Sequence, residues 1–318
     1  MKVLVTGGAG FIGSHLCEAL LARGDEVTVL DNFNDFYDPE IKRGNAALLT
    51  GARIVEGDIR DEKLVNQLFE EGRFDAVVHL AAMAGVRPSL KDPLLYQDVN
   101  LRGTMVLLEA TRSRPGTRFV FASSSSVYGG NTKVPFHEDD PVLTPISPYA
   151  ATKRSCELLA YTHHHLFGIP TTGLRFFTVY GPRQRPEMAI HKFVRLVLNG
   201  EPIPFFGDGS TRRDYTYVSD IVDGVVRSID RCEGFEIYNL GESETTSLAE
   251  LVKSIGEACG REPIIDRQPM QPGDVTITFA DVSKAKAKLD YKPEVPVSLG
   301  LGRFVQWYRD AHPSQNGA

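Results

Sequence analysis

The chain has 318 residues, of which 42% are hydrophobic and 24% are charged, and its formal net charge at pH 7 is −6. This composition is typical of a globular protein, excludes a disordered chain, and offers no basic surface for nucleic acid. No apolar run reaches the roughly 18 residues of a membrane-spanning helix, and Lys2 to Thr6 is too short for a signal-peptide core, so we expect a cytoplasmic protein without a membrane partner.

The first unit that the pattern predicts is a strand, a glycine-rich turn, a helix and a second strand. Lys2 to Thr6 is an apolar strand, an amphipathic helix runs to about Arg23, and the strand Glu26 to Leu30 ends at Asp31. The turn, Gly7-Gly8-Ala9-Gly10-Phe11-Ile12-Gly13, has the G-x-G-x-x-G spacing of a dinucleotide-binding fingerprint. Its glycines let a pyrophosphate approach the backbone where the helix begins. Asp31 can accept hydrogen bonds from both ribose hydroxyls and would repel a 2′-phosphate, so the sequence favours NAD over NADP.

Strands and helices continue to alternate along the chain. Further strands are predicted at Arg53 to Glu56, Asp75 to Leu80, Arg118 to Ala122, Thr171 to Phe176 and Glu236 to Leu240, and further helices at Pro93 to Arg114, Tyr149 to Phe167 and Val218 to Asp230. This order predicts an α/β fold, a Rossmann-type doubly wound parallel sheet with right-handed crossovers. Ligands of such sheets bind at the carboxyl ends of the strands.

The chain changes character after Thr178, where loops and turns rich in glycine and proline surround one predicted helix, Met188 to Leu198. Later helices are predicted at Ser247 to Cys259, Ser283 to Leu289 and Ser298 to Asp310, before a frayed polar tail, Pro313 to Ala318. We expect residues 1–177 and 215–241 to form the NAD-binding Rossmann domain, and residues 178–214 and 242–318 to form a smaller mixed α/β substrate-binding lobe. We expect no bound metal and reduced, mostly buried thiols, because Cys17, Cys156, Cys232 and Cys259 show neither metal-ligand nor disulfide spacing.

Small and polar residues stand where the predicted strands end. Asp58, just after the third strand, can accept a hydrogen bond from the adenine amino group of a dinucleotide. The run Ala81-Ala82-Met83-Ala84-Gly85 would let a flat cofactor approach closely, although small residues there also suit helix packing. Asn100 lies in the next predicted helix, and Ser123-Ser124-Ser125-Ser126 follows the fifth strand.

A tyrosine and a lysine come next. Tyr149 and Lys153 are four residues apart at the start of a helix, so their side chains lie on one face. The positive charge of a neighbouring lysine stabilises the phenolate form of a tyrosine, which can then act as a general base near neutral pH. The same spacing is common on solvated helix faces. The fingerprint that precedes it in the chain is what favours a catalytic role for this pair.

The fingerprint Thr6 to Gly13, Asp31, Ser124 and the Tyr149–Lys153 pair together resemble the extended short-chain dehydrogenase/reductase family, and within it the nucleotide-sugar 4-epimerases. The resemblance covers essentially the whole chain. It implies that Tyr149 takes the proton of the sugar's 4-hydroxyl while hydride passes from carbon 4 to NAD+. Lys153 would bridge the nicotinamide ribose, and Ser124 would hydrogen-bond the reacting oxygen. The 4-keto sugar then turns over and regains the hydride on its other face, so the implied enzyme is an isomerase with NAD as a bound cofactor.

The resemblance also implies the residues of both binding sites. For the cofactor they are Gly7, Gly10, Phe11, Ile12, Gly13, Asp31, Asn32, Asp58, Ile59, Leu80, Ala81, Ala82, Ala84, Asn100, Tyr149, Lys153 and Phe176. For a UDP-sugar substrate they are Arg87, Ser124, Ser125, Ser126, Tyr149, Thr178, Arg185, Met188, Phe206, Arg213 and Asp274. Arg213 would contact a phosphate, Asp274 the uridine ribose, and Phe206 the uracil, with plain core packing as the alternative for Phe206. Gln271 and Thr178 depart from many UDP-glucose epimerases, which carry arginine and asparagine there.

The residues after Ser124 decide which reaction follows the 4-keto intermediate. Relatives that decarboxylate carry a glutamate two positions after the catalytic serine or threonine, and 4,6-dehydratases carry an Asp-Glu pair directly after it. Here the two positions hold Ser125 and Ser126, so elimination has no evident proton donor and epimerisation is left.

Five segments resemble UDP-glucuronate 4-epimerases, namely Asn32 to Asp38, Ala84 to Ser89, Ser123 to Tyr128, Phe176 to Arg183 and Pro269 to Asp274. A carboxylate at carbon 6 of the sugar needs hydroxyl donors and a guanidinium, which can come from Ser125, Ser126, Thr178, Arg87 and Arg185. Both arginines could instead bind diphosphate or form salt bridges. We predict an enzyme that interconverts UDP-glucuronate and UDP-galacturonate. The alternatives are a UDP-glucose or UDP-N-acetylglucosamine 4-epimerase and, less favoured, a UDP-glucuronate decarboxylase.

Two further expectations concern the intermediate and the assembly. A 4-keto uronate is a β-keto acid that is prone to lose carbon dioxide, and we hypothesise that Ser125, Ser126 and Thr178 hold its carboxylate where overlap with the carbonyl π system is poor. The helices Pro93 to Arg114 and Tyr149 to Phe167 carry apolar faces. In the family such helices form a four-helix dimer interface, so we expect a homodimer, with burial inside one chain as the alternative.

Overall fold

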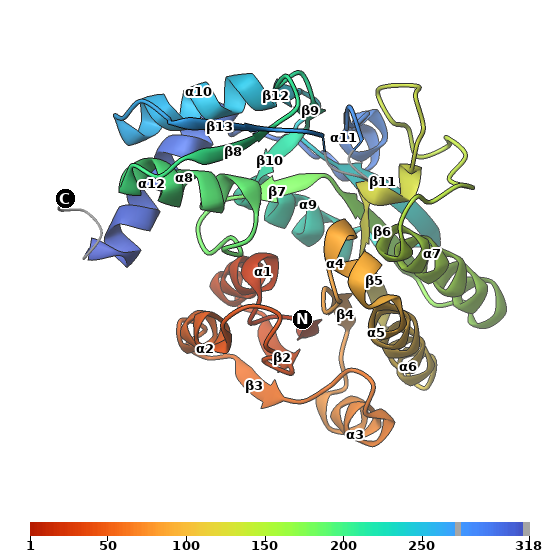
Figure 1. Ribbon diagram of the computed structural model, residues 1–318. Coiled ribbons are helices and arrows are strands. Elements are labelled where there is room, and N and C mark those ends of the chain that lie inside the picture. Colours follow the sequence, from red (N-terminus) through yellow and green to blue (C-terminus); the bar gives the residue numbers. More distant parts are fainter. Residues whose placement is uncertain (271–274, 314–318) are drawn as a thin grey trace.

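The computed structural model describes residues 1–270 and 275–313. Its main sheet consists of β1 Lys2–Thr6, β2 Glu26–Asp31, β3 Arg53–Glu56, β4 Ala76–His79, β5 Arg118–Ser124, β6 Thr171–Phe176 and β11 Phe235–Leu240. All neighbouring strands are parallel, in the order β11-β6-β5-β4-β1-β2-β3 (Figure 1). Every strand predicted for this sheet is present, and the predicted α/β, doubly wound fold class is confirmed.

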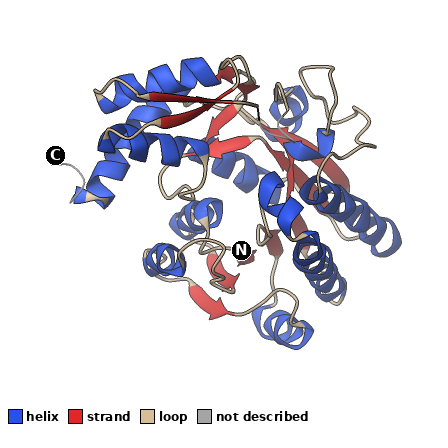
Figure 2. Cartoon of the chain, in the orientation of Figure 1, coloured by secondary structure: helices blue, strands red, loops and turns tan. Residues whose placement is uncertain are grey.

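Helices cover both faces of the main sheet (Figure 2). They are α1 Phe11–Ala22, α2 Pro39–Ala47, α3 Glu62–Gly72, α4 Val86–Lys91, α5 Pro93–Tyr96, α6 Gly103–Arg112, α7 Pro148–Phe167 and α9 Val218–Asp230. α1 packs against α9 over one face, and α3, α6 and α7 pack over the other. Because successive side chains of a strand point to opposite faces, Val3 and Val5 enter the first apolar core and Leu4 enters the second.

The smaller elements lie beyond the carboxyl ends of the strands (Figure 1). Three two-stranded sheets pair β7 Thr178–Tyr180 with β10 Tyr215–Tyr217, β8 Ile203–Phe206 with β13 Ile265–Gln268, and β9 Arg212–Arg213 with β12 Thr246–Ser247. The remaining helices are α8 Ala189–Asn199, α10 Leu248–Cys259, α11 Ser283–Leu289 and α12 Val297–Ala311. α11, which we expected in the smaller lobe, packs against β11 and α9. The division into two domains at the predicted boundaries stays a prediction.

In residues 178–214 the predicted helix is present as α8, and the predicted turns at 181–186 and 207–209 are loops, but the short strands of this segment were not predicted. Three short strands, β7, β8 and β9, lie in this segment, and each is two to four residues long. Their partners β10, β13 and β12 come later in the chain, so the pairing is non-local and leaves no alternating pattern long enough to recognise.

The helix predicted over Pro93 to Arg114 also differs from the structure. A π-helical segment, Gln97–Arg102, separates α5 from α6, and α6 ends at Arg112. The carbonyl oxygen of Asn100 within this segment accepts from the Thr104 hydroxyl at 2.5 Å and from the Cys156 thiol at 3.4 Å. These side-chain hydrogen bonds accompany the wider turn, and no local sequence pattern predicts them.

A buried carboxylate joins the main sheet to the smaller elements. Asp214 is fully buried between β9 and β10, and it accepts backbone N–H groups of Glu242, Ser243 and Ala280 at 2.8–3.1 Å. The neighbouring Glu242 carries an oxygen without a hydrogen-bond partner among the described residues. Burial, followed by the charges of Asp220 and Asp214, raises the pKa of Glu242 to about 8. Glu242 therefore holds a proton in the folded protein at pH 7 that the unfolded chain releases.

Glu242→Gln should stabilise the protein more at alkaline than at acidic pH. Because the pKa of Glu242 is raised on folding, wild type loses stability as pH rises from about 4.5 to about 8, and a neutral amide does not. We expect the melting temperature of the variant minus that of wild type to be more positive at about pH 8.5 than at about pH 5. Glu70→Gln, at an exposed side chain on α3, is the matched control and should show no such dependence on pH. An equal difference between Glu242→Gln and wild type at both pH values would refute the assignment.

Candidate active site

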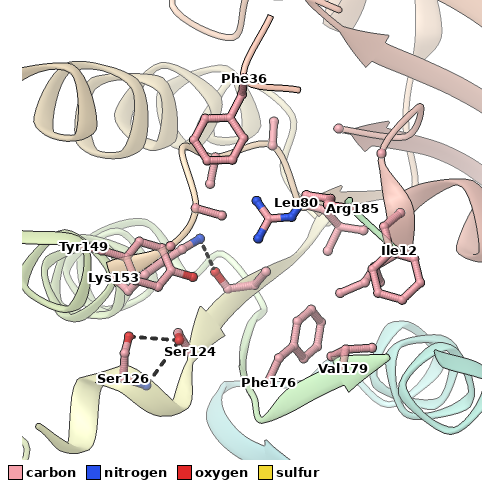
Figure 3. A pocket seen from close by; sticks show the side chains of 18 of the residues that line it. Ile12, Phe36, Leu80, Ser124, Ser126, Tyr149, Lys153, Phe176, Val179 and Arg185 are labelled. Atoms are coloured by element: carbon pink, nitrogen blue, oxygen red, sulfur yellow. Dashed lines mark hydrogen bonds between the residues drawn. The ribbon is translucent and has the colours of Figure 1, made fainter. Parts of the chain in front are cut away.

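A cavity of about 530 Å³ opens at the carboxyl ends of the main strands, facing the smaller elements (Figure 3). Most residues predicted for the two binding sites line it. They are Gly7, Gly10, Phe11, Ile12, Gly13, Asp31, Asn32, Ile59, Leu80, Ala81, Ala82, Ala84, Ser124, Ser125, Ser126, Tyr149, Lys153, Phe176, Thr178, Arg185, Met188 and Arg213. One cavity thus joins the fingerprint turn, the serine run and the tyrosine–lysine pair. Their individual roles stay predictions.

Two residues predicted for the cofactor site do not line the cavity. The carboxylate of Asp58 accepts three hydrogen bonds from the Arg60 side chain and backbone, which hold its pKa well below the usual range. The buried side chain of Asn100 donates to the Met83 carbonyl and the Thr152 hydroxyl, both at 3.0 Å, and accepts the Met83 N–H at 2.8 Å. Asn100 therefore fixes the small-residue loop after β4 from behind, and a direct contact of either side chain with a cofactor stays a prediction.

Two predicted substrate residues meet each other near the cavity without lining it. The guanidinium of Arg87, on α4, lies 5.4 Å from the ring centroid of Phe206, on β8. This contact joins the main-sheet side to the smaller elements. Asp274 and Gln271 lie outside the described residues.

The start of α7 presents the predicted catalytic pair. The Ser147 hydroxyl accepts the Ala150 N–H at 3.1 Å and caps the helix, and a proline occupies the first helical position. Tyr149 and Lys153 follow one turn apart, and both line the cavity. The Lys153 ammonium is buried and donates to the Ala122 carbonyl at 2.7 Å, which leaves two of its three protons for a ligand or for Tyr149.

The end of β5 presents the serine run. Ser124 closes the strand, and the residues after it form a 3₁₀ turn, Ser125–Tyr128. The Ser124 hydroxyl oxygen accepts the Ser126 N–H at 3.2 Å and the Ser126 hydroxyl at 2.9 Å (Figure 3). Ser124 and Tyr149 therefore border the same cavity from a strand end and a helix start.

A buried ionic network holds these two elements together from behind. Glu157, two turns after Tyr149 on α7, receives the Ser123 hydroxyl at 2.6 Å and two nitrogens of Arg175 at 2.9 and 3.0 Å. Arg154 adds a hydrogen bond at 2.8 Å. Burial alone would raise the pKa of Glu157, but the hydrogen bonds and charge of Arg175, together with the hydrogen bonds from Ser123 and Arg154, lower it. The carboxylate is charged and ties α7 to the strands β5 and β6.

The residues of the cavity fit a nicotinamide dinucleotide. Gly7 adopts a positive φ of 71°, and a Cβ on Gly13 would lie 2.1 Å from the Gly7 carbonyl oxygen, so the tight turn needs glycine at both positions. The turn brings the first N–H groups of α1, which lack intrahelical partners, to the cavity, where they favour a diphosphate. At the end of β2, Asp31 accepts the Ala9 and Phe33 N–H groups at 3.1 and 3.0 Å and keeps lone pairs for ribose hydroxyls.

The cavity concentrates positive charge although the chain is acidic overall. Lys42, Lys153, Arg185 and Arg213 all line it. Arg185 points into the cavity beside Phe36, with its guanidinium 5.4 Å from that ring centroid (Figure 3), and its Nε lies 3.3 Å from a Glu187 carboxylate oxygen. These cations favour an anionic ligand such as a nucleoside diphosphate.

Sequence reasoning missed part of the cavity wall. Asn34, Phe36, Tyr37 and Lys42 line the cavity but were not predicted as site residues. The buried Lys42 ammonium donates to both the carbonyl and the side-chain oxygen of Asn34, at 2.9 and 2.6 Å, and burial lowers its pKa. The available signal was Asp38-Pro39, a capping residue followed by proline, which begins the unassigned helix α2 that carries Lys42.

Three other properties can be stated for residues 1–270 and 275–313. All four cysteines are free and buried, as predicted. No group of three or more His, Cys, Asp or Glu side chains in these ranges is arranged to hold a metal ion. None of the helices described has the length and apolar character needed to cross a membrane.

Comparisons with known proteins agree with this fold. The family model described as GDP-mannose 4,6 dehydratase matches residues 4–303. UDP-glucuronate 4-epimerase 5 of Arabidopsis thaliana is 44% identical, over 97% of this chain and 75% of that protein. Among solved structures, UDP-glucuronic acid 4-epimerase from Bacillus cereus, in complex with UDP-glucuronic acid and NAD, has a TM-score of 0.91, with 37% identity over 98% of this chain and 100% of that one.

A second solved structure carries a different substrate name. UDP-glucose 4-epimerase from Thermotoga maritima, with UDP-glucose, has a TM-score of 0.92 and 35% identity, over 98% of this chain and 99% of that one. These two structures and the plant relative each match 97–98% of the chain, and the family model spans residues 4–303. The chain therefore belongs to the extended short-chain dehydrogenase/reductase family, in the GDP-mannose 4,6-dehydratase-like group that includes NAD-dependent nucleotide-sugar epimerases.

Proposed function

We propose that the protein is a UDP-glucuronate 4-epimerase that interconverts UDP-glucuronate and UDP-galacturonate. The observation that carries this proposal is the shared cavity. It brings hydroxyls of Ser125 and Thr178 and the guanidinium of Arg185 to the Tyr149 site, and hydroxyls with a guanidinium suit a sugar carboxylate. The identity to plant enzymes named for this activity supports the same substrate.

The residues around the cavity can carry a proton transfer at carbon 4 of the sugar. Tyr149 would take the proton of the 4-hydroxyl as a general base, and the Lys153 ammonium would stabilise the phenolate. Ser124 would donate a hydrogen bond to the oxygen as it becomes a carbonyl and again as it regains a proton. NAD, when bound at the fingerprint turn, supplies hydride transfer at carbon 4. Release of the product as the other epimer requires the keto sugar to present its opposite face.

The absence of carboxyl groups after Ser124 argues for epimerisation over elimination. The family model is described as a 4,6-dehydratase, and loss of water requires an acid and a base near carbons 5 and 6. The two positions after Ser124 are Ser125 and Ser126, whose hydroxyls titrate far outside the neutral range. A decarboxylase would likewise lack its glutamate at the second of these positions. UDP-glucose remains the second candidate substrate, because a solved relative with that name has the same fold at a TM-score of 0.92.

Thr178→Ala tests the proposal that the carboxylate is held away from decarboxylation. The Thr178 hydroxyl lines the cavity and donates to none of the described residues, so it is available to a ligand. One hydrogen bond to a charged group is worth about 1.5–3 kcal/mol, so the ratio of UDP-pentose to UDP-galacturonate should rise about tenfold or more. Chromatography of nucleotide sugars measures this ratio, with the exposed Thr162→Ala as control. No more pentose than in wild type would contradict the idea.

We also propose that the protein forms a homodimer through α5, α6 and α7. A groove there is lined by the apolar Leu94, Leu101, Met105 and Leu159, together with the polar Gln97, Asp98 and Arg102. Leu94 is 75% exposed and Leu158, on α7, is 52% exposed. Several exposed apolar side chains that lie together on adjacent helices are typical of a protein–protein interface.

Leu94→Glu should weaken this dimer without unfolding the chain, because the side chain is exposed and a glutamate suits the first turn of a helix. We expect wild type to sediment as a dimer of the 35.1 kDa chain, and the dissociation constant to rise at least about tenfold in the variant. Leu143→Glu, at a side chain that is 79% exposed in a loop, should have no effect. A monomeric wild type would refute the proposed interface.

The direct test of the proposed function is proton NMR of the purified protein with UDP-glucuronate. We expect UDP-galacturonate to form. The final mixture should be the same whether the reaction starts from UDP-glucuronate or from UDP-galacturonate. A protein that leaves UDP-glucuronate unchanged but converts UDP-glucose to UDP-galactose would keep the role of Tyr149 and overturn the role of the carboxylate-binding hydroxyls.

A further inference from the structure

The oxygen of Ser124 is held by its own neighbour. The Ser126 backbone N–H donates to Ser124 Oγ at 3.2 Å, and the Ser126 hydroxyl donates to the same oxygen at 2.9 Å (Figure 3). A serine hydroxyl has one proton and two acceptor positions. Both acceptor positions of Ser124 are therefore used, and its proton is the group that remains for a ligand.

The Ser124 side chain borders the cavity. Ser124 is 9% exposed, lines the cavity with Tyr149, and donates to no acceptor among the described residues. The adjacent Ser123 faces the other side of β5, where its hydroxyl donates to Glu157 at 2.6 Å. The buried side of the strand end is thus occupied by Ser123, whereas Ser124 borders the cavity that Tyr149 also lines.

The same geometry limits what Ser126 can do. Its hydroxyl has a single proton, and while this proton is donated to Ser124 it cannot be donated to a sugar carboxylate. The hydroxyls of Ser125 and Thr178 line the cavity and donate to none of the described residues, so they are the ones available to a carboxylate.

We propose that Ser126 is a positioning residue that orients the Ser124 O–H toward the oxygen at carbon 4 of the sugar, and that it is not a carboxylate ligand. The inference rests on the proposed function, because it concerns the group that stabilises charge on that oxygen. A preorientated donor costs no reorganisation as charge develops, so the effect falls on the chemical step and not on substrate binding.

A double-mutant cycle tests this role. Ser126→Ala removes the hydroxyl donor and keeps the backbone N–H, so kcat should fall about tenfold while KM changes less than about twofold. Ser124→Ala removes the oriented group and should lower kcat about 100-fold. In the Ser124→Ala background, Ser126→Ala should have no further effect, because there is no longer a hydroxyl to orient.

Ser125→Ala is the matched control. The Ser125 hydroxyl makes no hydrogen bond with Ser124, so Ser125→Ala should raise KM. The fold change in kcat/KM of the Ser124→Ala, Ser125→Ala double variant should equal the product of the two single changes. The positioning role would be overturned if the fold reductions in kcat of the two single variants multiplied in the double variant. It would also be overturned if Ser126→Ala changed KM instead of kcat.

A readout without catalysis separates this inference from the proposed function. In a neutron crystal structure of Ser126→Ala, the proton of the Ser124 hydroxyl should occupy more than one direction, whereas in wild type it should occupy one, toward the cavity. The cycle itself is measured on whichever UDP-sugar wild type converts. Failure to convert UDP-glucuronate would therefore overturn the proposed substrate, while a Ser124 proton that keeps a single direction in the variant would overturn the inference about Ser126.

Discussion

Tyr149→Phe should lower kcat by about 1,000-fold, because it removes the only atom of the side chain that can take the proton of the 4-hydroxyl. The phenyl ring keeps the edge-to-face contact with Tyr96, whose centroid lies 6.2 Å away, so the packing at the start of α7 is retained. Positioned general bases contribute about 100- to 10,000-fold, which sets the expected range. The loss is measured as initial rates by NMR, with substrate affinity followed separately by calorimetry.

The control for this substitution lies on the same helix. Tyr161 is 51% exposed, three turns after Tyr149, and it does not line the cavity. Tyr161→Phe should leave kcat within about twofold of wild type. A Tyr149→Phe variant that keeps more than about a tenth of the activity would show that another group takes the proton.

Glu157→Gln should cost about 3–5 kcal/mol of unfolding free energy, the largest stability effect that we predict for a single side chain. Glu157 is 1% exposed and Arg175 is 2% exposed, so the guanidinium would stay buried without a counter-charge. The amide keeps the shape of the carboxylate but cannot accept all four hydrogen bonds that now reach its two oxygens. Urea denaturation of both proteins measures the difference.

An exposed ion pair provides the comparison. The Glu62 side chain is 67% exposed and lies 3.8 Å from Arg102, so Glu62→Gln should change the unfolding free energy by less than about 1 kcal/mol. If Glu157→Gln cost no more than Glu62→Gln, the buried network would not be what holds α7 against β5 and β6.

The main sheet could be predicted from the sequence because its strands are apolar, central and regularly spaced between helices. The fingerprint, Asp31, Ser124 and the Tyr149–Lys153 pair could be found for the same reason, since each stands at a strand end or helix start that the pattern marks. Their convergence on one cavity follows from parallel strands, whose carboxyl ends share one edge of the sheet.

Other parts depend on contacts that sequence spacing does not reveal. The short strands β7, β8 and β9 find their partners far along the chain, and the π-helical segment at Asn100 accompanies side-chain hydrogen bonds from α6 and α7. Lys42 reaches the cavity only because α2 folds back beside Asn34. The hydrogen bonds between Asp58 and Arg60 likewise cannot be predicted from two residues that are two positions apart in a loop.

The same limit applies to the serine run. Four consecutive serines look alike in the sequence, yet Ser123 donates to a buried carboxylate, Ser124 accepts two hydrogen bonds, and Ser126 supplies both of them. The strand pleat and the 3₁₀ turn that follows separate their directions. The sequence could therefore predict that serine hydroxyls lie at the site, but it could not predict which hydrogen bond each of them makes.

The most direct test of the central claim is a competition experiment. The purified protein is given an equimolar mixture of UDP-glucuronate and UDP-glucose, and both sugars are followed together by proton NMR. We predict that UDP-galacturonate forms at least about 100-fold faster than UDP-galactose, since charged hydrogen bonds from a guanidinium and two hydroxyls distinguish the substrates. UDP-galactose forming at an equal or greater rate, or a UDP-pentose as the main product, would contradict the account.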